Sequence, residues 1–307
     1  MPPRSVAVLG EALVDEFHDG PVAGGAPFNV ARSLARLGAP TVFISRIGDG
    51  DANGALVLDS ARRYALDDQG LQRDPARATG RVSVHERADG GHSFEIHADA
   101  AWDHLALEPA RTALVGAKAD ILYFGSLAQR HAVSRATIRA LAKSFTGLRL
   151  LDLNLRPGTD NALFAAESLM LADWVKVNDE ELARLAGWFG ADGDEAAQVA
   201  ALMARFALQR VVLTLGADGW RFYGPGGAML TRGPGQPQPN VVDTVGAGDS
   251  FTALLLAGLA LGRDLPATLA LANRYASFIC GQRGPLPANP LALAPWRSAL
   301  LALPPSP

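Results

Sequence analysis

Cysteine is nearly absent from this sequence, whose 307 residues include only Cys280. A single cysteine excludes an internal disulfide and argues against a structural zinc cluster. Long apolar runs are also missing: Ala253–Leu261, the longest apolar stretch of a predicted helix, falls well short of the roughly 20 residues of a membrane span. A strand-like segment, VAVLG, follows Met1-Pro-Pro-Arg almost at once, which argues against a signal peptide. We therefore expect a cytoplasmic protein.

Charged residues are few as well, at 19% of the chain, and the net charge is −3 without a basic block. A surface without clustered lysine and arginine argues against nucleic acid as a partner. Apolar residues make up 49% of the sequence, so the chain can bury a substantial core. Its length suits one large α/β domain or two small ones.

Short apolar segments alternate with helical patterns along most of the chain. Strands are predicted at Ser5–Gly10, Thr41–Ile47, Asp120–Gly125, Leu148–Leu153, Trp174–Asn178 and Arg210–Leu215, with a hairpin at Trp220–Tyr223 and Ala228–Thr231. Helices are predicted at Asn29–Leu37, Asp51–Tyr64, Val133–Phe145, Asn161–Leu171, Glu195–Phe206 and Pro266–Cys280. This order predicts an α/β fold with a mainly parallel sheet covered on both faces, which binds ligands at the carboxyl ends of its strands. No repeat or low-complexity linker divides the chain, so we expect a single domain over residues 1–307.

Two segments, Leu13–Phe17 and Arg81–His97, break the alternation and have the pattern of antiparallel strands. The second is a predicted hairpin with its turn at residues 88–91. Its alternating apolar positions are Val82, Val84, Phe94 and Ile96. We expect a small β-sheet lid, with strands from about residues 11–22 and 79–103. A thin lid cannot bury its apolar face alone, and pairing of two lids across a two-fold axis predicts a homodimer.

The stretch Val241–Phe251, VVDTVGAGDSF, carries the clearest chemical signal. Val241-Val242 is predicted to end a strand, and Gly246-Ala247-Gly248 to form a tight turn before an apolar helix that stops at Gly262. A glycine turn at a helix N-terminus offers backbone N–H groups and the positive end of the helix dipole to an anion. Asp249 in that position is expected to be ionised and available as a base. Phosphoryl transfer to a hydroxyl requires this pairing of anion site and base.

This stretch also has two simpler interpretations. An ordinary strand–turn–helix junction with Asp249 as the helix cap is one alternative. A dinucleotide-binding fingerprint would need a third glycine where Phe251 stands, so that interpretation fails. The sequence also has no G-x-x-x-x-G-K-[ST] segment, which excludes a P-loop kinase.

The segment resembles the C-terminal signature of the ribokinase-like (PfkB) family of carbohydrate kinases. The resemblance implies a three-layer ribokinase-like fold with a β-sheet lid. It also implies that Asp249 is the catalytic base. The backbone N–H groups of Gly246, Ala247, Gly248 and Asp249 would form the anion hole.

Two N-terminal stretches, Gly10–Asp15 and Gly24–Asn29, resemble the family's sugar-binding signature in its fructokinase-like form, GEAL…GGAP…N. Carried over, Asp15, Gly24, Gly25 and Asn29 hold the sugar hydroxyls. Paired glycines allow close approach of the backbone, and an amide at the opening of a helix offers both a donor and an acceptor. A helix N-cap is the alternative for Asn29.

Two further motifs resemble elements along the family's phosphate path. Strand alternation puts Asp152, Asn154 and Arg156 on one side. The resemblance makes Arg156 a contact for the transferring phosphate, with a surface salt-bridge cluster as the alternative. The pair Asn178 and Glu181 resembles the N-x-x-E motif, which acts on Mg²⁺ and phosphate through water. The same two residues also fit a helix N-cap with a capping box, and both interpretations can hold together.

The nucleotide side is implied by the resemblance alone. The loop from Thr214 through Gly216 to Gly219 would line the ATP phosphates and ribose, and Asn273 the adenine pocket. A monovalent cation such as K⁺ is a further candidate ligand, near Asp243. Val245 replaces a threonine usual in the signature, and Thr252-Ala253 replace residues that are usually smaller; neither change removes the base or the glycines.

We therefore expect an ATP- and Mg²⁺-dependent kinase that phosphorylates a hydroxyl of a small sugar. The sugar motifs contain acids and neutral groups only, which favours a neutral sugar, and fructose is the expected acceptor. A sugar acid would require Arg32, Arg81 or Arg87 to reach the pocket. Alternatives within the family are a 2-keto-3-deoxy-sugar-acid, ribose or nucleoside kinase. From another class, a non-catalytic sugar-binding regulator stays open, as do the hydroxyl that is phosphorylated and any allosteric control.

Overall fold

The computed structural model describes residues 2–18, 20–86, 92–156 and 158–306, with only the backbone described at residues 84–86 and 92–94. Its main sheet has nine strands in the order β13-β12-β11-β10-β9-β8-β1-β4-β5. These are β1 (Ser5–Leu9), β4 (Thr41–Gly48), β5 (Leu71–Asp74), β8 (Ala119–Gly125), β9 (Leu148–Asp152), β10 (Trp174–Asn178), β11 (Arg210–Thr214), β12 (Trp220–Tyr223) and β13 (Met229–Gly233). All neighbours pair in parallel except at β12 and β13, which form an antiparallel hairpin at one edge. The predicted α/β fold with a mainly parallel sheet is confirmed.

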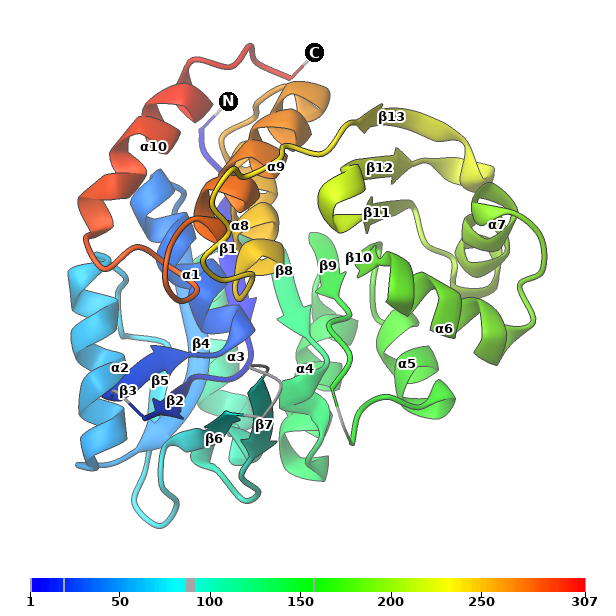
Figure 1. Cartoon of the computed structure of the whole chain (residues 1–307). Helices are drawn as coiled ribbons and strands as arrows, with labels where there is room; N and C mark the ends of the chain where they lie inside the picture. Colours follow the sequence, from blue (N-terminus) through cyan, green and yellow to red (C-terminus); the bar gives the residue numbers. More distant parts are fainter. Residues whose placement is uncertain (1, 19, 87–91, 157, 307) are drawn as a thin grey trace.

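Helices cover both faces of the main sheet, as Figure 1 shows. Alternation along β1 divides the core, because Val6 and Val8 face one apolar cluster and Ala7 and Leu9 face the other. The first cluster includes side chains of α1 (Ala26–Leu37), α2 (Ala52–Arg63), α8 (Ala247–Ala260), α9 (Leu265–Cys280) and α10 (Ala294–Leu301). The second includes side chains of α3 (Leu107–Gly116), α4 (Ala132–Ser144), α5 (Ala162–Leu169), α6 (Asp179–Phe189) and α7 (Glu195–Phe206). The three predicted layers are therefore present.

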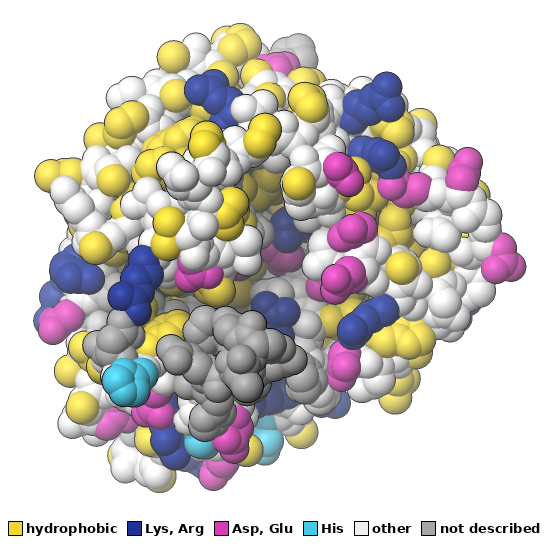
Figure 2. Space-filling model, in the orientation of Figure 1, with side chains coloured by type: hydrophobic (Ala, Val, Ile, Leu, Met, Phe, Trp, Pro, Cys, Tyr) yellow, Lys and Arg dark blue, Asp and Glu magenta, His cyan; other side chains and the backbone are white. Residues whose placement is uncertain are grey.

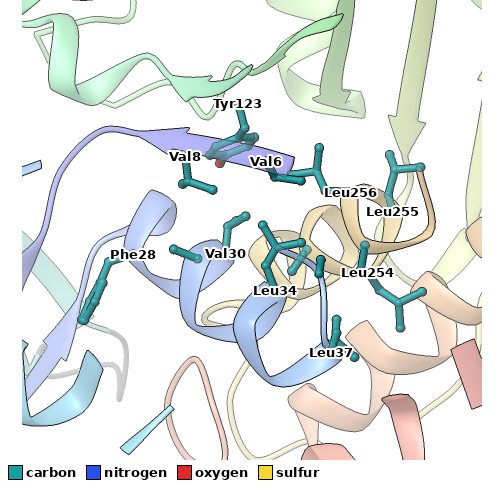
Figure 3. Close-up of a cluster of buried hydrophobic side chains, with 14 of the residues drawn as sticks. Val6, Val8, Phe28, Val30, Leu34, Leu37, Tyr123, Leu254, Leu255 and Leu256 are labelled. Carbon is teal, nitrogen blue, oxygen red and sulfur yellow. The ribbon is translucent and has the colours of Figure 1, made fainter. Parts of the chain in front are cut away.

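The helices α1 and α8 pack side by side on the same face of the sheet (Figure 3). Val30, Leu34 and Leu37 of α1 share a fully buried cluster with Leu254 and Leu256 of α8. This packing brings two helix N-termini, far apart in the sequence, to the same end of the sheet. It is the feature that positions the candidate site.

A separate lid sheet of four strands has the order β3-β2-β6-β7. Its strands are β2 (Leu13–Phe17), β3 (Gly20–Gly24), β6 (Gly80–Glu86) and β7 (His92–Ile96). The predicted lid strands are thus present, with β2 and β6 paired in parallel and the outer pairs antiparallel. The turn expected at residues 88–91 lies outside the described residues.

The lid's apolar face is partly covered by the chain itself. Val82 is only 4% exposed, and Ile96 packs against the second apolar cluster. The expectation that a thin lid leaves these two residues uncovered was therefore wrong, because the lid strands fold back onto the body. The side chains of Val84 and Phe94, which completed that expectation, lie outside the described part of the chain.

The limits of α1 show why its predicted start was three residues late. The helix begins at Ala26, after Gly25 at φ 103°, and the Asn29 N–H donates to the Gly25 carbonyl at 2.8 Å. Pro27 lies in the first helical turn, where its missing N–H costs nothing. The predicted end at Gly38 is confirmed, with φ 86° in the left-handed region.

Some elements differ from the sequence-based expectation. Val241 and Val242 are not in a strand: both are exposed, and the Val242 N–H donates to the Cys280 carbonyl at 2.8 Å. The elements β3, β5, α3 and α10 were not predicted. Among the helices of the described residues, none combines the length and apolar character needed to span a bilayer.

Candidate active site

Asp249 lies in the first turn of α8, as predicted, and is partly buried. Gly246 caps this helix at φ 81°, and a Cβ on it would lie 2.5 Å from Pro285 Cα, so no other residue fits here without a shift of the backbone. Of the donors expected for the anion hole, the Ala247 N–H already donates to the Thr244 carbonyl at 3.3 Å. The N–H groups at the start of a helix have no carbonyl partner within the helix, so this turn retains an affinity for an anion.

A relay of hydrogen bonds from α1 holds the Asp249 carboxylate. Asn29 Nδ2 donates to Asp249 Oδ2 at 2.8 Å, and Arg32 Nη2 donates to Asn29 Oδ1 at 2.5 Å. Because a guanidinium can only donate, Arg32 requires the amide oxygen to face it, and the amide nitrogen must face Asp249. Arg32 is in turn held by Ser60 Oγ at 2.6 Å and the Ala23 carbonyl at 3.0 Å. Sequence reasoning placed Asn29 in the site and missed Arg32 as its support.

Burial raises the pKa of Asp249 to about 6, against the smaller effect of the Asn29 hydrogen bond, which lowers it. The negative charge of Asp152 raises this pKa further, whereas Lys176 and Arg156 lower it. The sequence predicted an ionised Asp249, and a pKa of about 6 is compatible with that prediction, although loss of water raises the pKa above its ordinary value. At neutral pH Asp249 is still mostly ionised and able to accept a proton.

Glu11 and Asp15, from the segment after β1 and from β2, line the same region. Burial raises the pKa of Glu11 to about 8 and that of Asp15 to about 6, and the charge of Asp249 raises both. Among the described residues no group hydrogen-bonds to Glu11 Oε2. A Cβ on Gly24 would lie 2.3 Å from Asp15 Oδ2, and one on Gly25 would lie 2.8 Å from the Glu11 carbonyl oxygen. The two glycines therefore allow the acids and the backbone to share one pocket.

A buried ion pair lies behind the turn, in the centre of the main sheet. Lys176 Nζ is 3.0 Å from Asp152 Oδ1, and Thr252 Oγ1 of α8 is 2.8 Å from Asp152 Oδ2. Burial alone would lower the pKa of Lys176, but Asp152 and Glu181 raise it above its usual value. Lys176 was missed as a site residue. A lysine between Val175 and Val177 in a central parallel strand is a signal, because such a residue needs a buried partner.

Asn178 and Glu181 form the capping box that was one of the two interpretations. Asn178 Oδ1 accepts from the Glu181 N–H at 2.8 Å, and Glu181 Oε2 accepts from the Asn178 N–H at 3.0 Å. Glu181 Oε1 also accepts from the Leu155 N–H at 2.8 Å, which ties α6 to the segment that follows β9. Burial raises the pKa of Glu181, against Lys176, which lowers it.

Arg156 is exposed and lies close enough to Glu11 and Asp249 to lower the pKa of both. Its one described side-chain hydrogen bond is from Nη1 to the Leu155 carbonyl, at 3.0 Å. The strand alternation predicted to put Asp152, Asn154 and Arg156 on one side does not extend through this segment, because β9 ends at Asp152 and Asn154 has φ 42° in the left-handed region.

Two of the residues expected at the nucleotide, Gly219 and Asn273, lie against the chain at the end of β13. A Cβ on Gly219 would lie 2.2 Å from the Gly233 carbonyl oxygen, and Asn273 Nδ2 donates to the Pro234 carbonyl at 2.9 Å. Thr214 ends β11 at the carboxyl edge of the sheet, and Gly216 follows at φ 54°. The structure thus gathers Gly219 and Asn273 around one loop.

Asp243 lies in the same signature loop as Asp249, but its oxygens are engaged locally. Asp243 Oδ1 accepts from the Val245 N–H at 2.9 Å, and Oδ2 accepts from the Gly284 N–H at 3.1 Å. Among the described residues, no group of three or more histidine, cysteine, aspartate or glutamate side chains is placed to hold a metal ion.

The space-filling view shows the molecule hollowed near its centre, between the α8 and α9 end of the main body and the lid. Basic and acidic side chains both line this hollow in Figure 2.

This fold and site define a sugar kinase with a ribokinase-like architecture. The chain belongs to the pfkB family of carbohydrate kinases, whose model matches residues 8–291. A fructokinase from Klebsiella pneumoniae is 33% identical over 276 residues, which is 86% of this chain and 86% of that protein. The predicted family is therefore confirmed.

Two solved structures support the same conclusion. The fructokinase from Xylella fastidiosa with bound ATP has a TM-score of 0.81 at 25% identity, covering 96% of this chain and 99% of that one. A putative ribokinase II from E. coli has a TM-score of 0.82 at 20% identity, with the same coverage, and shares the fold. The predicted ribokinase-like fold is confirmed.

Proposed function

We propose that this kinase transfers the γ-phosphoryl group of ATP to a hydroxyl of a neutral sugar, with D-fructose as the preferred acceptor. The observation that carries the proposal is the Asp249 carboxylate, partly buried at the first turn of α8 and held by Asn29 at 2.8 Å. A base in contact with a site for an anion is what phosphoryl transfer to a hydroxyl needs.

In the proposed reaction, Asp249 accepts the proton of the sugar hydroxyl. The hydroxyl oxygen forms a bond to the γ-phosphorus as the bond from that phosphorus to the β–γ bridging oxygen breaks, and ADP leaves with the bond's electron pair. The backbone N–H groups of Gly248 and Asp249 and the guanidinium of Arg156 stabilise the charge on the transferring oxygens. Asn29 keeps the carboxylate oriented toward the hydroxyl.

The residues present suit a magnesium ion that arrives with ATP. Mg²⁺ keeps most of its waters and needs one or two carboxylates plus phosphate, rather than a cage of protein ligands. Glu181 fits this role, since each of its oxygens accepts one backbone N–H and keeps a lone pair for a metal-bound water. Bound there, the ion would neutralise charge between the phosphates. A monovalent cation near Asp243 would rely on backbone carbonyls, because both carboxylate oxygens already accept N–H groups.

The charges around the sugar pocket support a neutral acceptor. Arg32 is buried and has both Nη atoms engaged, and Arg81 forms an ion pair with Glu16 at 3.2 Å. Arg87 lies outside the described residues. Among the described candidates, only Arg156 is left to meet a substrate carboxylate, and it is needed for the phosphoryl group. The similarity to fructokinases supports fructose among the neutral sugars.

The test is a panel of acceptors: fructose, glucose, ribose, adenosine and 2-keto-3-deoxygluconate, each with ATP and Mg²⁺. We expect the highest kcat/KM for fructose. Asp249→Asn should lower kcat for the preferred acceptor by about 10²–10⁴-fold, the usual contribution of a general base, and change KM for the sugar far less.

The matched control is Asp179→Asn, which alters an exposed acid in the first turn of another helix, α6, and should leave kcat unchanged. A tenfold preference for the sugar acid would overturn the assignment to fructose. Near-normal turnover of Asp249→Asn would place the base elsewhere. A wild-type protein that binds sugar but consumes no ATP would instead be a regulator built on this fold.

A further inference from the structure

We propose that Lys176, Asp152 and Thr252 act together as a positioning unit for phosphoryl transfer, by tying the first turn of α8 to the sheet and setting the charge at Asp249. This inference rests on the function proposed above. None of the three side chains is required to touch the sugar or the nucleotide, so they act through α8.

The ion pair is built into the centre of the main sheet. Lys176 on β10 and Asp152 on β9 are cross-strand partners in register, with Nζ 3.0 and 3.2 Å from the two carboxylate oxygens. Their side chains are 7% and 3% exposed. A buried pair of this kind seldom stabilises a fold more than apolar residues of the same size would, because both charges lose water. The presence of this ion pair in the buried centre of the sheet therefore indicates a role in function rather than in the stability of the fold.

Contacts lead from this pair to the catalytic turn. Thr252 Oγ1 lies 2.8 Å from Asp152 Oδ2 and 3.0 Å from the Gly248 carbonyl oxygen. Lys176 Nζ lies 3.5 Å from the place where a Cβ on Gly248 would be. The glycine thus lets the ammonium approach the backbone of the turn. The single hydroxyl hydrogen of Thr252 is shared between Asp152 and the Gly248 carbonyl, and this contact links α8 to the sheet. Thr252 stands where a smaller residue is usual in the signature. Its hydroxyl contacts Asp152, which a residue without a hydroxyl could not do.

The two charges of the pair also have opposite electrostatic effects on the pKa of Asp249. Asp152 raises the pKa of Asp249 and Lys176 lowers it. The ammonium adds a full positive charge behind a turn that already has the partial positive charge of a helix N-terminus. The other titratable or charged groups that interact with Asp249 are Glu11, Asp15, Arg32, Tyr123 and Arg156. Substitution of Asp152 or Lys176 leaves these other groups unchanged. Each substitution therefore reports the effect of one charge on the pKa of Asp249.

The test is a pH titration of the Asp249 carboxyl by ¹³C NMR in protein labelled at aspartate, with the signal assigned by its loss in Asp249→Asn. Lys176→Met should raise the pKa of Asp249 by about one unit, and Asp152→Asn should lower it by a similar amount, the order of effect expected of a nearby charge. The double variant should fall between them. Arg149→Met is the matched control: it removes another ion pair of β9, at the opposite end of the strand (Arg149 to Asp173, 2.6 Å), and should not move the titration.

A variant that changes no charge tests the positioning part. Thr252→Val removes only the hydroxyl, and we expect kcat to fall about tenfold, the effect of a lost hydrogen bond that orients a reacting group. The pKa of Asp249 should stay near its wild-type value, and Thr252→Ser should restore kcat. This variant also serves if Lys176→Met does not fold.

Shifts of the same sign in the two charge variants, or no shift in either, would overturn the electrical part of the proposal. Wild-type kcat in Thr252→Val would overturn the positioning part. If the wild-type protein has no kinase activity while the two opposite shifts are found, the proposed function fails and the ion pair still sets the charge of Asp249.

Discussion

At the scale of single residues, loss of water decides the protonation states around Asp249. Glu11 is buried and Asp249 is partly buried, and loss of water raises the pKa of each by more than any neighbour lowers it. The two acids nevertheless differ in charge at neutral pH, because Asp249 accepts a hydrogen bond from Asn29 whereas Glu11 Oε2 has no described partner. One pocket thus contains an acid that is mostly ionised and another that is mostly neutral.

This difference predicts how stability depends on pH. The pKa of Glu11 is about 8 in the folded chain and 4.5 at its ordinary value, so the folded state holds a proton that the unfolded state loses. The free energy of unfolding should therefore fall as pH rises from about 4.5 to 8, and Glu11→Gln should lack this fall. We expect the stability of the variant relative to wild type to increase by about 2–4 kcal/mol between pH 5 and 8.

Urea unfolding at a series of pH values measures this difference. Glu16→Gln, on the more exposed part of β2, is the control and should follow the wild type. Parallel curves for Glu11→Gln and wild type would show that Glu11 is ionised in the folded chain.

At the scale of elements, the helix termini carry both the structure and the chemistry. The N-terminus of α8 presents Asp249, the proposed base, that of α1 presents Asn29, and that of α6 is closed by its own capping box. Glu181 completes that box and also accepts the Leu155 N–H, so a single carboxylate joins α6 to the segment that follows β9. The same segment leads into Arg156.

Substitution of Glu181 should therefore affect stability as well as any metal-dependent step. Glu181→Ala leaves the N–H groups of Asn178 and Leu155 without their acceptor, and we expect a loss of about 2 kcal/mol in the free energy of unfolding. Glu181→Gln keeps one acceptor oxygen and should lose less. The neighbouring Glu180→Ala, exposed in the same turn, should be close to neutral.

Urea denaturation without nucleotide or metal isolates the capping role. If Glu181→Ala were as stable as Glu180→Ala, the two N–H groups would have found other acceptors. A separate rise in the Mg²⁺ concentration needed for half-maximal activity of Glu181→Gln would support the metal role as well.

Much of the fold was predictable because apolar strands and capped helices have local signals. Trp174–Asn178 and Glu195–Phe206 have the bounds expected from their patterns. The strand predicted at Val241-Val242 was wrong. An apolar pair before a glycine turn is typical of a strand end, but here the Val242 N–H donates to the Cys280 carbonyl. The strand β3 was missed because Gly20, Pro21 and Gly24 are poor strand formers.

The candidate site was predictable where its residues form one continuous motif, as around Asp249. It was not predictable where residues from separate strands or helices come together only in the fold. Lys176 becomes a site residue only once β9 and β10 are known to be neighbours with Asp152 opposite it. Arg32 becomes a support only once α1 is known to face Ser60 and Asp249. The rise in the pKa of Asp249 likewise depends on burial, which no short stretch of sequence reports.

At the scale of the whole molecule, the described lid strands form an open sheet with two outer strands. Its outer strands are β3 and β7, each paired on one side within the sheet. On β3, Val22 is 40% exposed. An open edge with an exposed apolar side chain can add a strand from another chain. Since Val82 is already buried, this edge is the remaining argument for the homodimer inferred from the sequence.

We predict that the protein is a dimer through the lid at micromolar concentration, and that Val22→Asp lowers its mass toward that of a monomer. Sedimentation equilibrium measures the mass directly. Val115→Asp, which places the same charge at a more exposed valine on α3, should leave the dimer intact. A wild-type protein that is monomeric with and without fructose would rule out this assembly.

The packing of α1 against α8 has a consequence for the order of synthesis. The apolar face of α1 leaves the ribosome early, but Leu254 and Leu256, which cover it, are among the later residues to be made. Until then the nascent chain exposes Val30 and Leu34, a surface that invites chaperone binding or aggregation. Asp249 lies on the same late helix, so completion of the core and acquisition of the base occur in one step. A chain released before α8 is complete should be recognised as unfolded and should have no capacity to consume ATP.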